Sequence, residues 1–335
     1  MRKSLRVVWV MVFAICVGLA GCGIRSADDV VKNLQSVQKN LKSYKSTATM
    51  TVQTPSSTSK YYIETWYQAP GNYRIALGNE KKEISQVILR NEDGIYVVNP
   101  QLKKSYRFRG DWSENQGGHV YLYHALVDRI LQAKDKELSI RKDSVLINMS
   151  MLPENPIITK QQVLLDDRKL YPKQMVLFNK ENQPIVTVDY ESFDTGMNFQ
   201  KDAFTPEAAM ALANTDGTVA VAGGKSDFGV IEPAYLPKGM TLKDVKEQDQ
   251  TIYLVYTDAQ GNVATITEAR AEPGAVALPS GKMQDLLGTP AIVTGSGNVK
   301  TLYWTHQNLE FSLTSSLPVQ EMTKMAQSTM SAIGK

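Results

Sequence analysis

The sequence predicts an α+β protein of two parts, in which a long antiparallel sheet with helices is followed by a smaller α+β domain. Its 335 residues suggest two domains at about 150 residues each. Strand-like segments that end in turn signals follow one another between amphipathic helices. A stretch of small and polar residues, 214–225, separates two such series and is the predicted linker. The composition, 42% hydrophobic and 21% charged, is that of an ordinary globular chain.

The charge balance indicates no nucleic-acid partner. Lys+Arg 37 against Asp+Glu 34 leaves +3, and Arg2, Lys3 and Arg6 supply all of this excess. The remainder of the chain then has as many basic as acidic side chains, 34 of each. A nucleic-acid-binding domain needs a basic face, which a balanced chain does not predict.

Residues 1–21 predict a signal peptide. A basic start precedes an apolar run, 7–18, which is shorter than the ~20 residues of a membrane-spanning helix. The segment ends in Leu19-Ala20-Gly21-Cys22, which resembles the lipobox of bacterial lipoproteins. That resemblance implies cleavage before Cys22, a diacylglycerol on its sulfur, and a lipidated tether at 22–25. An ordinary secretory signal, or an uncleaved anchor with an incidental cysteine, is the alternative.

A helix is predicted directly after the tether. Ser26 and Asp29 form a variant capping box, with Ser26 as the N-cap. Apolar side chains then follow at helical spacing: Val30, Leu34, Val37, Leu41 and Tyr44. Because few residues separate this helix from Cys22, we expect the folded body to lie close to the membrane surface.

The segments after this helix alternate with the period of two that is typical of strands. Turn signals such as Pro70-Gly71-Asn72 and Glu92-Asp93-Gly94 divide them. A helix is predicted at 121–133, and Thr205 with Pro206 begins a short one. The predicted strands are 46–54, 60–69, 73–77, 85–91, 95–99, 104–109, 145–151, 161–165, 173–178 and 185–193.

Residues 226–335 predict the smaller α+β domain. A helix closes this domain at 318–333, with an apolar face made of Met322, Met325, Ala326 and Met330. Its predicted strands are 251–257, 264–269, 291–294, 299–304 and 309–314.

Three phrases of the first part resemble the LolA/LolB/RseB-type family of lipoprotein-sorting proteins. They are YQAPGNYRI at 67–75, NEDGIYVVNP at 91–100 and LYPKQM at 170–175. The resemblance covers about residues 27–212. It implies a LolA-like domain at 26–213, in which a curved antiparallel half-barrel packs on helices and encloses an apolar cavity.

Within this family, the chain resembles the lipoprotein branch of Gram-positive spore formers, the sporulation or germination lipoproteins. The second part resembles a small uncharacterised domain found on such envelope proteins. The residues that suggest this are 235–240, 302–304 and the final helix.

The sequence predicts no enzyme, no metal site and no cofactor. Cys16 lies in the predicted signal peptide and Cys22 at the lipidation site, so no thiol is left for catalysis. His119 and His124 are five residues apart and not at the i, i+4 spacing of zinc ligands, and we interpret them as solvent or loop residues. No G-x-S-x-G nucleophile motif occurs.

The strand alternation predicts a binding face on the first sheet. Each strand has one apolar face, and methionine suits an adaptable pocket for an acyl chain. The candidate ligand-binding residues are Ile63, Tyr67, Tyr73, Ile75, Val87, Leu89, Val145, Ile147, Met149 and Met151. A sheet covered by a helix shows the same alternation, so an ordinary core is the alternative.

These patterns together predict a non-enzymatic lipoprotein, lipid-anchored to the extracytoplasmic face of the cell membrane through Cys22. Its half-barrel would bind or sense a lipid or another ligand that bears an acyl chain. The alternative is a scaffold that binds an envelope protein, such as an envelope enzyme, in sporulation or germination. An anchor and an extra domain fit these roles better than ferrying between membranes, which is the role of the soluble carrier in the resembled family.

Overall fold

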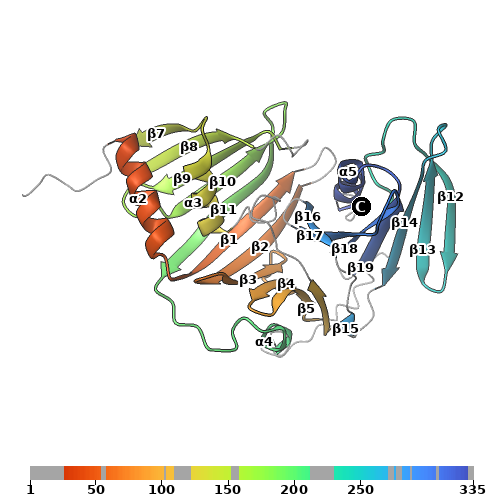
Figure 1. Cartoon of the computed structure of the whole chain (residues 1–335), viewed down its shortest axis with the longest axis horizontal. Coiled ribbons are helices and arrows are strands. Elements are labelled where there is room, and N and C mark those ends of the chain that lie inside the picture. The colour runs from red at the N-terminus through yellow and green to blue at the C-terminus, as the bar shows by residue number, and fades with distance from the viewer. Residues whose placement is uncertain are drawn as a thin grey trace, which may run out of the picture.

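The computed structural model describes residues 26–53, 58–101, 103–108, 122–151, 158–211, 230–270, 275–276, 281–286, 289–306 and 309–330. Within these residues the chain forms two sheets and the helices α2 to α5 (Figure 1). The predicted signal peptide, Cys22 and the predicted linker 214–225 lie outside the described residues.

The first sheet has twelve strands in the order β15-β6-β5-β4-β3-β2-β1-β11-β10-β9-β8-β7. Neighbouring strands run antiparallel except β15, which pairs in parallel with β6. The sheet curves, and α2 and α3 lie on one side of it (Figure 1), so the predicted antiparallel fold with packed helices is confirmed. Its strands are β1 (Ser43–Gln53), β2 (Thr58–Gln68), β3 (Asn72–Gly78), β4 (Ile84–Asn91), β5 (Gly94–Asn99), β6 (Lys104–Phe108), β7 (Glu137–Arg141), β8 (Ser144–Ser150), β9 (Lys160–Asp166), β10 (Pro172–Phe178), β11 (Pro184–Thr195) and β15 (Ala275–Val276).

The second sheet has seven strands in the order β12-β13-β14-β19-β18-β17-β16. The strands β12 and β16 were not predicted from the sequence. All eight residues of β12 are exposed, so this strand lacks the alternation that marks a half-buried one. The strands are β12 (Thr241–Gln248), β13 (Thr251–Thr257), β14 (Val263–Arg270), β16 (Lys282–Leu286), β17 (Thr289–Thr294), β18 (Lys300–His306) and β19 (Leu309–Ser315).

The first helix, α2 (Ala27–Asn40), begins as its capping residues predict. The hydroxyl of Ser26 accepts a hydrogen bond from the N–H of Asp29 at 3.1 Å. The helix ends at Asn40, however, and the prediction that its apolar face continues to Tyr44 is wrong. Tyr44 belongs to β1, because the segment from Ser43 pairs with both β2 and β11.

Tyr44 lies at the centre of an aromatic cluster beneath α3 (Tyr123–Gln132). Its fully buried ring stacks on Tyr67 at 5.3 Å and on Phe193 at 4.9 Å between ring centroids, and it meets Tyr123 edge-on. Tyr67 and Phe193 come from β2 and β11, which flank β1 on its two sides. The cluster therefore joins α3 to both halves of the sheet.

The same tyrosine supplies a cap to α3. The N-cap residue Leu122 makes no side-chain capping bond, so the first N–H groups of the helix need other acceptors. The hydroxyl oxygen of Tyr44 accepts the N–H of Tyr123 at 3.0 Å. The strand at the middle of the sheet thus fixes where α3 begins.

The two short helical predictions late in the chain are confirmed. The helix α4 (Pro206–Ala211) begins where Thr205 and Pro206 predict, with the Thr205 hydroxyl accepting the N–H of Ala208 at 3.3 Å. The helix α5 (Val319–Thr329) covers one face of the second sheet. Its residues Met322, Met325 and Ala326 are buried in the second core, together with Leu254, Ile266, Leu302 and Leu313 of the sheet.

The two sheets contact each other through polar side chains. Lys104 and Tyr106 of β6 are both buried and both hydrogen-bond to the carboxylate of Glu310 in β19. Gln86 of β4 donates to the Thr305 hydroxyl of β18 at 3.2 Å. These bonds, and the pairing of β15 with β6, hold the second part of the chain against β4 to β6.

We expect Tyr44→Phe to destabilise the fold by about 1–3 kcal/mol, because it leaves the buried N–H of Tyr123 without its acceptor. The free energy of unfolding from urea titration measures this. The matched control is Tyr171→Phe, which removes an exposed hydrogen bond to Thr195 and should cost far less. Equal stability of the two variants would contradict the capping role.

Candidate functional site

Eight of the ten predicted ligand-binding residues lie on one face of the first sheet, which we call the inner face. Seven of them are buried in a single apolar cluster with α2 and α3, and Met151 packs against that cluster. These eight residues are Ile63, Tyr67, Tyr73, Ile75, Val145, Ile147, Met149 and Met151. The structure therefore brings most of the predicted set together, in contact with the protein's own helices.

The second part of the chain also covers the inner face. Met283 of β16 and Ile292 of β17 belong to the same cluster as the eight residues. The helices contribute Val30 and Leu34 from α2 and a row of α3 side chains that includes Leu126. Helices and second sheet together thus bury the apolar face that the sequence predicted as a binding site.

Val87 and Leu89 do not join this set, so their assignment to a common binding face is wrong. In the register of β3 and β4, Val87 lies opposite Ala76 and Leu89 opposite Arg74. They are buried in a separate cluster on the other face of the sheet, the outer face, beneath Ala209 of α4. Alternation along one strand separates its two faces but cannot say which face points toward α2 and α3.

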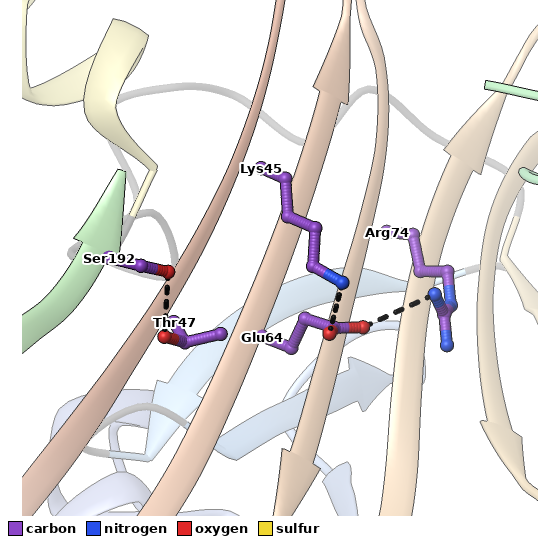
Figure 2. Close-up of polar contacts among 5 residues, drawn as sticks. All are labelled: Lys45, Thr47, Glu64, Arg74 and Ser192. Carbon is purple, nitrogen blue, oxygen red and sulfur yellow. Dashed lines mark hydrogen bonds and ion pairs between the residues drawn. The ribbon is translucent and has the colours of Figure 1, made fainter. Parts of the chain in front are cut away.

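The outer face carries a charged cluster across three neighbouring strands. Glu64 of β2 accepts from Lys45 of β1 at 2.9 Å and from Arg74 of β3 at 3.5 Å (Figure 2). The Arg74 side chain is only 5% exposed, and burial lowers its pKa while the nearby Glu64 carboxylate partly offsets this. Glu64 thus supplies the countercharge for a buried guanidinium.

Aromatic side chains flank this cluster. The Arg74 guanidinium lies 4.1 Å from the ring centre of Trp66, and Lys45 approaches the same ring at 5.3 Å. The ring of Phe199 stacks on Trp66 at 5.1 Å. The indole N–H of Trp66 is buried and has no acceptor in the part of the chain that the structure describes.

Hydroxyl groups extend the polar surface along β1 and β11. Thr47 and Ser192 share a hydrogen bond of 2.9 Å (Figure 2), and Thr49 donates to Glu191 at 2.8 Å. Glu191 is about half exposed and lies 3.9 Å from Lys82. The outer face is therefore polar and solvent-accessible at β1 and β11, and apolar under α4 at β4 and β5.

The interpretation of His124 as a solvent or loop residue is wrong. His124 lies in α3, stacks on Tyr67 at 4.2 Å between ring centroids, and has a buried Nδ1 without a hydrogen-bond partner among the described residues. Burial, and then the positive charge of Arg90, lower its pKa to about 4. His306 of β18 is also buried, which lowers its pKa to about 4. Both imidazoles are thus neutral at pH 7. His119 lies outside the described residues.

The outer face brings lysine, arginine, carboxylate and aromatic side chains together. Within the described residues, no three His, Cys, Asp or Glu side chains are grouped so that they could hold a metal ion. Across the same residues, no helix combines the length and the apolar character that crossing a membrane requires. Arginine and aromatic side chains are enriched in protein interfaces, whereas lysine and carboxylate side chains are depleted there.

One sequence pattern already indicated part of this surface. The alternation already places Glu64 and Arg74 on the polar sides of their strands. Lys45, Glu64 and Arg74 are far apart along the chain, and only the pairing of β1 with β2 and of β2 with β3 brings them together.

The chain is similar to known sporulation proteins along its length. Residues 2–204 match the family described as "Sporulation protein YdcC-like", and residues 230–328 match a domain of unknown function, DUF4367. The chain is 30% identical to "Sporulation protein YdcC" of Bacillus subtilis (strain 168), covering 98% of this chain and 97% of that protein.

Solved structures of LolA-like and MucB-like proteins are also similar to it. The Pseudomonas aeruginosa MucA/MucB complex contains a chain with 13% identity and a TM-score of 0.33, covering 90% of this chain and 96% of that one. The LolA superfamily protein NE2245 of Nitrosomonas europaea has 9% identity and a TM-score of 0.30. The match covers 55% of this chain and 100% of the NE2245 chain. The complex of the Clostridioides difficile CwlD amidase with the GerS lipoprotein has 19% identity and a TM-score of 0.29, covering 53% of this chain and 98% of that one.

We expect Glu64→Gln to destabilise the protein by about 1–3 kcal/mol, because the buried Arg74 loses its countercharge. The free energy of unfolding at pH 7 measures this. The control Glu191→Gln removes a carboxylate that is 46% exposed and should cost about 0–1 kcal/mol. A Glu64→Gln variant as stable as the native protein would show that the cluster does not hold the outer face together.

Proposed function

The chain belongs to the YdcC-like sporulation protein family, and on this premise we propose that it is a membrane-anchored, extracytoplasmic protein that binds an envelope protein through the outer face of its first sheet. The proposed role is binding without catalysis. The predicted lipobox at Cys22 supports the anchor, and the chemistry of the outer face supports the partner.

The observation that carries this proposal is the occupation of the inner face by the chain itself. The apolar side chains of the inner face contact α2, α3, Met283 and Ile292. A ligand on this face would have to displace either a helix or part of the second sheet. Among the described residues, the outer face at β1 and β11 carries no such cover, which makes it the better candidate for a partner.

The composition of the outer face fits a protein partner. Trp and Tyr side chains are among those that dominate the binding energy of protein interfaces, and Trp66 and Tyr62 lie on this face with partly exposed side chains. Threonine hydroxyls and a lysine–carboxylate pair supply the polar rim. Most of these groups are already ordered by contacts with one another, so a partner would meet a preorganised surface.

A second candidate is the ligand with an acyl chain on the inner face. Four methionines belong to the inner cluster: Met50, Met149, Met175 and Met283. Methionine side chains repack readily, so this core is more adaptable than one built of branched residues. An acyl chain that entered here would separate Met283 from the first sheet.

The anchor is tested by substituting each cysteine in turn. We expect the full-length native protein to incorporate labelled fatty acid and to sediment with membranes, whereas Cys22→Ser loses the label because the acceptor sulfur is gone. The matched control Cys16→Ser changes a cysteine of the predicted signal peptide and should keep the label. Labelling of Cys22→Ser would contradict the proposed lipidation.

The partner surface is tested by placing a large cation on the outer face without touching the Glu64 cluster. Thr51→Arg on β1 should weaken partner binding about tenfold or more, a loss of about 1.4 kcal/mol or more, and should therefore lower the yield of heat-resistant spores. The test strain produces this variant in place of the native protein. Immunoblotting checks that the protein level is unchanged.

The matched control is Thr265→Arg, which makes the same change on the face of β14 that points away from α5. Normal sporulation with Thr51→Arg would contradict the outer-face proposal. Mass spectrometry of the purified protein separates the two candidates, because a lipid bound besides the anchor favours the inner face.

A further inference from the structure

The edge strand β12 is open to solvent on three sides. It is the last strand of the second sheet and pairs only with β13 in the described part of that sheet (Figure 1). All eight of its residues are exposed, including Leu242 and Val245, the latter with 43% of its surface accessible. Its outer edge offers backbone N–H and C=O groups to another strand.

The charges of β12 are arranged symmetrically about Val245. Asp244 and Lys246 flank this residue and carry opposite charges, whereas Lys243 is the extra residue of a β-bulge between Leu242 and Asp244. An antiparallel second copy of β12 centred on Val245 therefore places a basic side chain opposite an acidic one at two positions.

From this symmetry we propose that β12 pairs antiparallel with β12 of a second copy of the chain, about a twofold axis at Val245. In that register Asp244 lies opposite Lys246 of the second copy, and Lys246 lies opposite Asp244. The two Val245 side chains meet at the axis. The two seven-stranded sheets become one continuous sheet with an isologous interface.

The faces of β12 agree with this register. In an antiparallel pair, residues directly opposite each other point to the same face. Asp244 and Lys246 lie opposite Val255 and Tyr253 of β13, on the face that points away from α5. Val245 lies opposite Leu254 of the second core, so the central contact continues the apolar side of the sheet.

The charge symmetry makes a sharp test possible. Asp244→Lys and Lys246→Asp each place like charges opposite each other at two positions of the dimer, which should weaken dimerisation about tenfold or more. The double variant Asp244→Lys/Lys246→Asp restores opposite charges and should dimerise as the native chain does. A mixture of the two single variants should form a heterodimer, because each supplies the charges that the other lacks.

The measurement is the mass in solution of the full chain purified in detergent, by sedimentation equilibrium over a range of protein concentrations. Glu181→Lys and Lys180→Asp are the matched controls, since they make the same charge changes in the turn between β10 and β11. Arg141→Glu tests a different edge strand, β7 of the first sheet. Circular dichroism checks that every variant is folded.

A monomeric native chain would overturn the proposal, and so would a double variant that is no better than the singles. If Arg141→Glu abolished the dimer and Asp244→Lys did not, the contact would be at β7, and the proposal would also be overturned. A second measurement uses intact membranes: Val245→Cys should form an intermolecular disulfide under mild oxidation. The equally exposed control Val263→Cys on β14 should not.

Discussion

The fold depends on the contact between a tyrosine at the middle of the first sheet and the start of a helix. β1 lies between β2 and β11, so it joins the two halves of the sheet. Tyr44 of this strand stacks on a side chain from each neighbour and accepts the first N–H of α3. The helix is thereby held over the inner face, and the inner face becomes a core. The outer face is left for the charged cluster around Glu64 because the inner one is already occupied.

Local patterns predicted the elements of the fold well. Ser26, Thr205 and the methionine face of α5 each lie where their capping or periodic signals place them, because such signals depend on neighbours within a few residues. Together with the family resemblance, they were sufficient for an α+β class with antiparallel sheets. Tyr44 was misassigned because its spacing continues that of α2, whereas strand pairing with residues far along the chain decides its structure.

The site was less predictable than the fold. Alternation identified the apolar side chains of each strand. The side chains of Val87 and Leu89, however, lie on the outer face of the sheet, where α4 covers them. The register between strands, which the sequence does not state, decides that Glu64 lies between Lys45 and Arg74. The His124 ring stacks on Tyr67 where α3 packs against the sheet, a tertiary contact with no local signal. A surface assembled from three strands thus needs the pairing as well as the pattern.

The pairing of β15 with β6 has a consequence for how the chain matures. During synthesis the N-terminal residues emerge first, and the strand at Lys104–Phe108 is made long before Ala275 and Val276 reach it. Until then the newly made first domain exposes the open edge of β6. Lys104 and Tyr106 on this strand are then without the Glu310 carboxylate to which they hydrogen-bond in the complete fold. Such an intermediate is prone to misassociation until the second part of the chain has been made.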